Sequence, residues 1–405
     1  NMRSSFASLI KFVAIVLATG STVVACAKPN VTPEPEPEKP EKPDVVLPEK
    51  VIPKFIHATY IVGDRLTSPT EIAQSNYAKF HFIYLMAAPA VVASDFDKVD
   101  SDIIKKYVTD YLYPTTASGR GLVPSLIKQA RSMGSKVLLS VAGHEDLVPI
   151  IKSPTKRAKF AHMIANFVDK FNYDGVELDW EGGFDIDLHA SMMNDLRIEL
   201  DKIEQKQVSR LYLTTALGTW RKYNFDQAKR LSGIVDWVNL MTYDFGGGNW
   251  GNKPSHNTPL NGIKQAIAQN FSNFAPNKIC IGLANYGYQY FGLKPDVAVE
   301  AGMLEKHGRS IGYHEIPRCL AQGWTEQWDE TASAPYYFSP DKKDFASHDN
   351  IRSLDAKLDW IIEQKFLGEF WWVFNCDYVE PKAGEKYATN VLIDHVEEQY
   401  KKLVK

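Results

Sequence analysis

From residue 55 onward, the chain alternates short apolar runs with longer segments of helical period. Several of the short runs are apolar at consecutive positions, as strands are when helices cover both faces of a parallel sheet. We predict eight strands, over residues 55–60, 80–86, 136–142, 175–181, 211–217, 237–243, 279–284 and 370–374. Eight strands in regular alternation with helices predict an α/β fold, a (β/α)8 TIM barrel within residues 54–405.

The clearest helical segment follows the third predicted strand. Ser153 suits the N-cap position, and Pro154 suits the first position of a helix. One face of the following segment is apolar and carries Phe160, Ile164, Phe167, Val168 and Phe171. This pattern predicts an amphipathic helix that packs against the barrel.

The connection between the seventh and eighth predicted strands is too long for a single helix. Residues 288–338 are rich in Gly, Tyr, Trp and Pro and include short strand-like pieces such as 310–313. We predict a small α+β insertion after strand seven, at about residues 288–338. In a barrel, that connection lies on the face where active sites are built.

The first 25 residues have the pattern of a targeting segment. A basic start precedes an apolar run that is too short and too interrupted to predict a membrane span. The residues ending in Cys26 resemble a bacterial lipobox, so we interpret 1–25 as a lipoprotein-type signal peptide and Cys26 as the lipid anchor. The alternative is an ordinary secretory signal with an incidental cysteine.

Residues 26–53 repeat Pro with Glu and Lys and contain few apolar positions. Such a composition cannot bury a core and predicts an extended linker. We therefore expect an exported protein tethered to a membrane through its lipid anchor, at the bacterial outer membrane or the cell surface. A periplasmic or secreted protein is the alternative.

The overall charge and the cysteine and histidine positions restrict the possible functions. A net charge of −3 without a basic segment gives no reason to expect nucleic acid as a partner. The histidines have no Cys or acid neighbours at ligand spacing, so we expect neither a metal nor a cofactor. Cys280, Cys319 and Cys376 are odd in number, and we expect free thiols.

The fourth predicted strand carries a row of acidic side chains. Its period of two places Glu177, Asp179 and Glu181 on one face and apolar residues on the other. Carboxylates at that spacing, away from water, push one another's pKa values apart. A site that keeps one acid protonated and another charged needs this arrangement, whereas a solvated edge strand is the alternative.

Other predicted strand ends supply further candidates. Strand three contains Ser140, strand six ends with Met241 and Tyr243 before Asp244, and strand eight contains two adjacent tryptophans. Period two turns only one of these tryptophans inward, and we expect Trp372 at the site and Trp371 against helices. Acids, a phenol and a tryptophan around one opening suit the recognition of a sugar ring.

These motifs, taken in order, resemble those of glycoside hydrolase family 18, the chitinase family. The segment 174–181, DGVELDWE, is similar to the family's D-G-x-D-x-D-x-E signature at every position but one. The segment around Ser140 resembles the strand-three S-x-G-G motif, and 241–244 matches the strand-six M-x-Y-D motif. The segment 282–287, GLANYG, resembles the strand-seven G-L-P-x-Y-G pattern.

The resemblance implies a retaining, substrate-assisted mechanism without a protein nucleophile. Glu181 would protonate the glycosidic oxygen, and the carbonyl of the substrate's own N-acetyl group would attack the anomeric carbon. Asp179 would hold the acetamido nitrogen, and Tyr243 would bind the acetamido group from the other side. Glu181, Asp179 and Tyr243 are thus the implied catalytic residues.

The resemblance also implies the supporting and sugar-binding residues. Glu177 and Ser140 would lie behind Asp179, with Glu177 sharing a proton with Asp179, and Asp244 would help to fix the sugar and the acid. Trp372 would form the floor of the sugar site. The further substrate-binding residues would be Met241, Tyr60 and Tyr286.

Three positions depart from the family pattern. Glu177 replaces the usual Asp and is one methylene longer, Ala142 replaces the first glycine of the strand-three motif, and Tyr288 replaces the usual Arg after strand seven. The proton donor is unaffected, so we expect activity on β-1,4-linked N-acetylglucosamine polymers such as chitin. The alternatives are an endo-β-N-acetylglucosaminidase acting on N-glycan cores and a non-catalytic glycan-binding protein on the same barrel.

Overall fold

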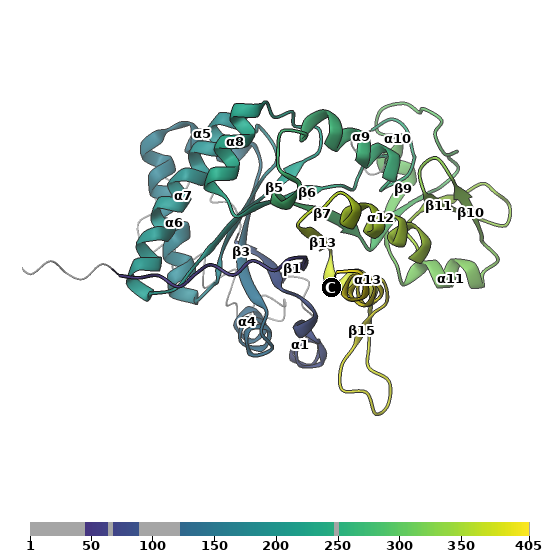
Figure 1. Ribbon diagram of the computed structural model, residues 1–405. Coiled ribbons are helices and arrows are strands. Elements are labelled where there is room, and N and C mark those ends of the chain that lie inside the picture. The colour runs from purple at the N-terminus through teal and green to yellow at the C-terminus, as the bar shows by residue number, and fades with distance from the viewer. Residues whose placement is uncertain (1–44, 64–67, 89–121, 247–250, 405) are drawn as a thin grey trace, which may run out of the picture. The chain divides into compact units, whose positions relative to one another are not determined.

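The computed structural model describes residues 45–63, 68–88, 122–246 and 251–404, with the side chains of residues 87 and 88 outside that description. Eight parallel strands close into a barrel in the order β1-β13-β7-β6-β5-β4-β3-β2 (Figure 1). The strands are β1 Ile56–Val62, β2 Phe82–Ala88, β3 Lys136–Gly143, β4 Gly175–Trp180, β5 Tyr212–Gly218, β6 Trp237–Met241, β7 Ile279–Ala284 and β13 Gly368–Trp372. The predicted TIM barrel is confirmed.

Helices follow the strands as the hydrophobic period predicted. They are α1 Pro69–Gln74, α4 Val123–Ser132, α5 Val148–Lys152, α6 Pro154–Phe171, α7 Ile186–Gln207, α8 Phe225–Ile234, α9 Leu260–Asn270, α12 Ile351–Glu363 and α13 Val391–Leu403. Figure 1 shows α6, α7 and α8 along the outside of the barrel. These helices cover the outward faces of the strands.

Helix α6 begins where its cap residues indicated. The Ser153 hydroxyl accepts a hydrogen bond from the backbone N–H of Lys156 at 3.4 Å, with Pro154 at the first position. The helix ends at Asn172, which adopts the left-handed conformation (φ 58°) that asparagine tolerates better than most residues. Phe160 and Ile164 are buried against the barrel.

The predicted insertion is confirmed and is larger than its sequence pattern suggested. A five-stranded antiparallel sheet of order β10-β11-β12-β8-β9 lies between β7 and α12. Its elements are β8 Tyr286–Tyr290, α10 Met303–His307, β9 Gly308–Gly312, α11 Glu315–Ala321, β10 Thr325–Asp329, β11 Ala334–Phe338 and β12 Phe345–Ser347. The first and last strands of the insertion along the chain, β8 and β12, pair with each other. The sequence pattern of the single strands cannot show such a pairing.

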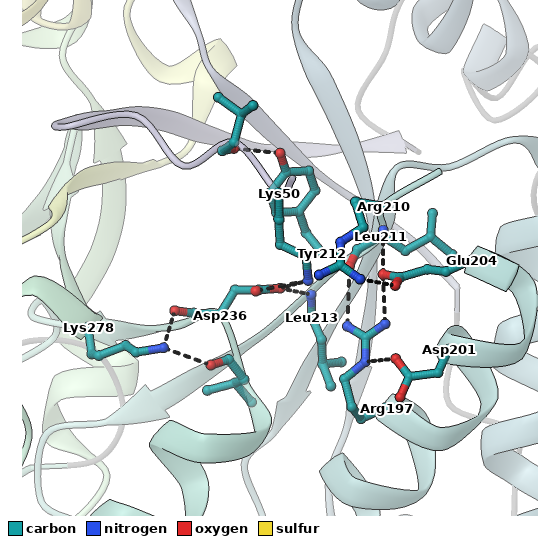
Figure 2. A network of polar contacts seen from close by, with 12 residues as sticks. Lys50, Arg197, Asp201, Glu204, Arg210, Leu211, Tyr212, Leu213, Asp236 and Lys278 are labelled. Atoms are coloured by element: carbon teal, nitrogen blue, oxygen red, sulfur yellow. Dashed lines mark hydrogen bonds and ion pairs between the residues drawn. The ribbon is translucent and has the colours of Figure 1, made fainter. Parts of the chain in front are cut away.

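The residues just before the barrel are attached to the amino ends of its strands. Lys50 forms an ion pair of 3.0 Å with Asp236, which precedes β6, and the Tyr212 hydroxyl donates to the carbonyl of Val51 at 2.6 Å (Figure 2). In the same region, Glu204 accepts hydrogen bonds from Arg197 and Arg210, both at 2.9 Å. The chain therefore enters the barrel at the end opposite the carboxyl ends of the strands.

Several sequence predictions concern residues outside the described part of the chain. The signal peptide, Cys26 and most of the linker 26–53 fall there. Cys280 and Cys319 are buried free thiols, as expected, whereas Cys376 is half-buried. No helix in the described ranges is long and apolar enough to cross a membrane.

Candidate active site

The acidic row of β4 lies as its alternation predicted. Val176, Leu178 and Trp180 are buried in the core between the barrel and its helices. Glu177 and Asp179 face the barrel interior, where both are buried. One strand thus separates an apolar outer face from an acidic inner face.

Glu177 is held at the centre of the barrel by side chains from four other strands. One carboxylate oxygen accepts from the Tyr60 hydroxyl and from the Ser140 hydroxyl at 3.4 Å, and the other accepts from Thr214 at 3.3 Å and from the Asn239 amide. Burial raises the pKa of Glu177 to about 7, against the opposing effect of these hydrogen bonds.

The extra methylene of Glu177 explains how one carboxylate reaches all four donors. Tyr60 lies on β1 and Asn239 on β6, on either side of β4 in the barrel. The Glu177 carboxylate lies at the barrel centre and contacts both of these side chains. Both oxygens of the Glu177 carboxylate therefore have hydrogen-bond partners.

Asp179 is a buried acid with an unsatisfied oxygen. Its Oδ1 atom is buried and accepts no hydrogen bond from the described residues. Burial raises the pKa of Asp179 well above its usual value, and the neighbouring charges of Glu181 and Glu177 raise it further, whereas the cation of Arg221 lowers it. No hydrogen bond joins Asp179 to Glu177 in the described structure, so their coupling acts through space.

Glu181 follows the end of β4 and is half-buried. Its backbone N–H donates to the carbonyl of Gly143 at 2.9 Å, which ties it to the end of β3. The indole of the preceding Trp180 donates to the carbonyl of Gly182 at 2.7 Å. The backbone that carries Glu181 is thus fixed on both sides, while its carboxyl group lies at the carboxyl ends of the strands.

Arg221, in the loop between β5 and α8, is a neighbour of the acids that the sequence motifs did not reveal. Its Nη2 atom donates to the carbonyl of Glu181 at 2.6 Å, and its guanidinium lies 3.6 Å from the ring centroid of Phe184. In the described part of the chain it has no salt-bridge partner, and its Nε atom is buried without a hydrogen bond. Its charge therefore remains available to the nearby Asp179 and Glu181.

The two tryptophans of β13 point to opposite sides, as predicted. Trp371 is fully buried in the core outside the barrel, whereas Trp372 is partly exposed and packs with the residues inside it. The Trp372 ring lies 5.4 Å from that of Tyr60. Trp372 thus offers an aromatic surface at the end of the barrel that carries Glu181.

Tyr60, on β1, lies deep inside the barrel. Only 2% of its surface is exposed, and its hydroxyl donates to Glu177. Tyr60 thus supports the Glu177 carboxylate and its ring contacts that of Trp372, while its sugar contact stays a prediction. The period of two along the strand predicts that the Tyr60 side chain points into the barrel, but it does not predict how deep in the barrel the side chain lies.

Asp244 is bound by two tyrosines of the insertion. The hydroxyls of Tyr286 and Tyr288 both donate to its Oδ1 atom at 2.6 Å. Asp244 has a left-handed backbone (φ 61°), and its N–H donates to the side chain of Asn257 at 2.7 Å. Tyr286 is buried and supports Asp244, while its sugar contact stays a prediction.

Tyr243 and Met241 complete the arrangement. Both are partly buried at the end of β6, and the Tyr243 ring lies 6.0 Å from that of Tyr286. Burial and the charges of Asp179 and Asp244 raise the pKa of Tyr243 well above its usual value, so it remains a neutral hydrogen-bond donor. In the described ranges, no group of three or more His, Cys, Asp or Glu could hold a metal ion.

Sequence comparison connects this arrangement to known proteins. The sequence profile described as Glycosyl hydrolases family 18 matches residues 71–377. Chitinase A1 of Niallia circulans is 28% identical over 285 residues, covering 60% of this chain and 40% of that protein. Chitinase 1 of Aphanocladium album is 26% identical over 352 residues, covering 78% of this chain and 81% of that protein.

A solved structure shows the same fold. The chitinase of Cycas revoluta, determined in complex with (GlcNAc)3, superposes with a TM-score of 0.67 at 17% identity. The match covers 85% of this chain and 99% of that one. The matched region spans less than half the length of the Niallia circulans protein, so the relatives differ in their additional segments.

Proposed function

Because the chain belongs to glycosyl hydrolases family 18, we propose that it hydrolyses β-1,4-linked N-acetylglucosamine polymers with retention of configuration. The observation that carries this proposal is the pair formed by Glu181 and Asp179. Glu181 lies at the carboxyl ends of the strands, and Asp179, two residues earlier on the same face, has a buried oxygen that accepts no hydrogen bond from the described residues.

The first step requires a proton and an internal nucleophile. Glu181 gives its carboxyl proton to the glycosidic oxygen as the bond from this oxygen to the anomeric carbon breaks. The carbonyl oxygen of the substrate's acetamido group attacks the anomeric carbon and forms an oxazolinium ion. The leaving sugar departs as an alcohol, and Glu181 is left as a carboxylate.

Asp179 suits the stabilisation of that ion. Its Oδ1, which has no partner among the described residues, can accept the acetamido N–H, and its negative charge offsets the positive charge of the oxazolinium ring. Water then attacks the anomeric carbon and gives a proton to Glu181, while the bond from this carbon to the acetamido oxygen breaks and the N-acetyl group is restored. Two inversions at one carbon restore the β configuration.

Glu177 contributes as a proton partner in this proposal. Both Glu177 and Asp179 have raised pKa values, so near neutral pH the pair keeps a proton that isolated carboxyl groups would have lost. As Asp179 meets the developing cation, the proton is favoured on Glu177. The four donors around Glu177 keep it in place while the charge changes.

Trp372 and Asp244 would position the sugar. The partly exposed indole of Trp372 can pack on the apolar face of a pyranose ring. Tyr243, a neutral phenol, can donate to the acetamido carbonyl and hold it for attack. Asp244, fixed by Tyr286 and Tyr288, retains lone pairs for sugar hydroxyl groups.

The proposed location follows from the sequence and fits the entry of the chain into the barrel. Residues 26–53 and Cys26 remain our prediction for a tether and its lipid anchor. Lys50 and Val51 are attached to the amino ends of the strands, whereas Glu181 lies at the carboxyl ends.

One comparison tests the proposed function. The purified protein is incubated with N-acetylchitohexaose and, separately, with a high-mannose glycoprotein, and the products are identified by mass spectrometry. We expect shorter chitooligosaccharides from the first and no released glycan from the second. Glycan release alone would favour the N-glycan enzyme, and binding without products would favour the lectin-like alternative.

A further inference from the structure

Trp220 is a large aromatic side chain that the proposed mechanism does not use. It lies two residues beyond the end of β5, and 66% of its surface is exposed. Strand β5 is the neighbour of β4 in the barrel, so Trp220 and Glu181 leave adjacent strands at the same end. Single exposed apolar residues are common on protein surfaces, so a function requires further support.

The backbone beneath Trp220 provides that support. A Cβ atom built on Gly218 would lie 2.5 Å from the Cζ2 and Cη2 atoms of the indole, which is closer than side-chain atoms approach one another. The Trp220 indole therefore packs directly on the backbone of Gly218, at the end of β5. Since so much of the side chain is exposed, the ring keeps a surface open to a ligand.

A second contact connects the ring to the acid. The guanidinium of Arg221 lies 5.5 Å from the centroid of the Trp220 ring. The same guanidinium donates to the carbonyl of Glu181 and lies over Phe184. Trp220 is thus part of a contact series that ends at the backbone of the proton donor.

The order of the strands indicates on which side of the scissile bond a sugar could contact Trp220. Trp372 lies on β13, four places from β4 around the closed ring. A sugar on Trp372 would therefore lie across the barrel from Glu181 and have its glycosidic bond directed to the acid. The next sugar, which belongs to the leaving group, would extend past β4 toward its neighbours.

We propose that Trp220 is a sugar-binding platform for the leaving-group side of the substrate, and this rests on the function proposed above. Its occupant is an N-acetylglucosamine residue of the departing chain, with the apolar face of its pyranose ring on the indole. Gly218 allows the ring to lie flat, and Arg221 keeps it next to Glu181. Longer chains gain this contact, whereas short ligands bound on Trp372 do not.

A matched control is available on the same face. Phe225 is the first residue of α8 and is 62% exposed. It makes no ring or cation contact with Arg221 or Trp220 in the described structure. Replacing it removes a similar aromatic surface without removing the proposed platform.

Two substrates distinguish the leaving-group side from the rest of the site. The measurement is kcat/KM of the full protein on N-acetylchitohexaose and on 4-nitrophenyl N,N′-diacetylchitobioside, whose leaving group is no sugar. We expect Trp220→Ala to lower kcat/KM about tenfold on the hexamer and less than about twofold on the aryl substrate. Trp220→Phe should recover most of the loss, and Phe225→Ala should change neither value.

The outcomes separate this inference from the proposed function. An equal loss on both substrates, or no loss on the hexamer, would overturn the platform while the hydrolase assignment stands. If the native protein hydrolyses neither substrate, the proposed function fails. Binding of N-acetylchitohexaose to Glu181→Gln then decides the platform alone: a Trp220→Ala exchange in that variant must weaken binding about tenfold, and unchanged binding would refute it.

Discussion

The guanidinium of Arg221 donates a hydrogen bond of 2.6 Å to the main-chain carbonyl of Glu181. It approaches the proton donor through its backbone, so the carboxyl group of Glu181 is left free for the substrate. The cation also lowers the pKa of Asp179 against the effect of burial. Arg221 is therefore a positioning residue that acts on both acids.

Replacing Arg221 by Gln should change the pH dependence of hydrolysis. Without the cation, the pKa of Asp179 rises further, so its carboxylate forms only at higher pH. The acid limb of the kcat/KM profile should move to higher pH, and the maximum should fall by about tenfold or more. Lys222→Gln is the control, since it removes one charge from an exposed neighbouring side chain, and it should leave the profile in place.

Shortening Glu177 to Asp should destabilise the barrel, although Asp is the family's usual residue here. The carboxylate would withdraw from Tyr60 and Asn239, and buried donors without partners cost about 1–3 kcal/mol each. We expect the free energy of unfolding in urea to fall by roughly 2 kcal/mol. Ser140→Ala, which removes the long 3.4 Å contact, should cost less than half of that; equal costs would contradict the proposed role of the four donors.

The raised pKa of Glu177 predicts how stability changes with pH. The unfolded chain loses this proton near pH 4.5 and the folded protein near pH 7, so between these values the folded state binds more protons. Its stability must fall as pH rises through this window, by roughly 3 kcal/mol in total. From pH 4.5 to 7, the unfolding free energy of the native protein should therefore fall relative to that of Glu177→Gln, whose amide does not titrate. Parallel pH curves for the two proteins would argue against the raised pKa of Glu177.

The contact between Tyr288 and Asp244 predicts an effect on substrate affinity. Tyr288→Phe removes one of two phenol donors to this carboxylate, which leaves Asp244 less firmly oriented toward the sugar. Hydrogen bonds to charged groups contribute about 1.5–3 kcal/mol, so KM should rise about tenfold with a smaller change in kcat. Tyr290→Phe, on the same strand, removes a hydroxyl that donates to the carbonyl of Gly246 and should leave KM unchanged.

The barrel and the acidic row could be predicted because their signals are local. Period two along β4 separates Glu177 and Asp179 from Val176 and Leu178, and the same period distinguishes Trp372 from Trp371. These assignments need only neighbouring residues. The helices likewise show their buried faces within a few turns, as α6 does from Phe160 onward.

Residues that act across the barrel could not be found in this way. Asn239 and Thr214 bind Glu177 from strands far away in the sequence, and neither has a local feature that differs from an ordinary strand residue. Arg221 lies in the loop after β5, and it contacts Phe184, which is distant in the sequence. The resemblance named Tyr60 as a sugar contact, but the strand pattern could not show how deep in the barrel this side chain lies.

The central claim is that Glu181 supplies the proton, and Glu181→Gln tests it most directly. An amide has nearly the shape of the acid but cannot deliver a proton. Initial rates of N-acetylchitohexaose hydrolysis should fall by about a thousandfold or more, while calorimetry should show hexamer binding within a few-fold of the native value. Turnover close to that of the native protein would contradict the assignment.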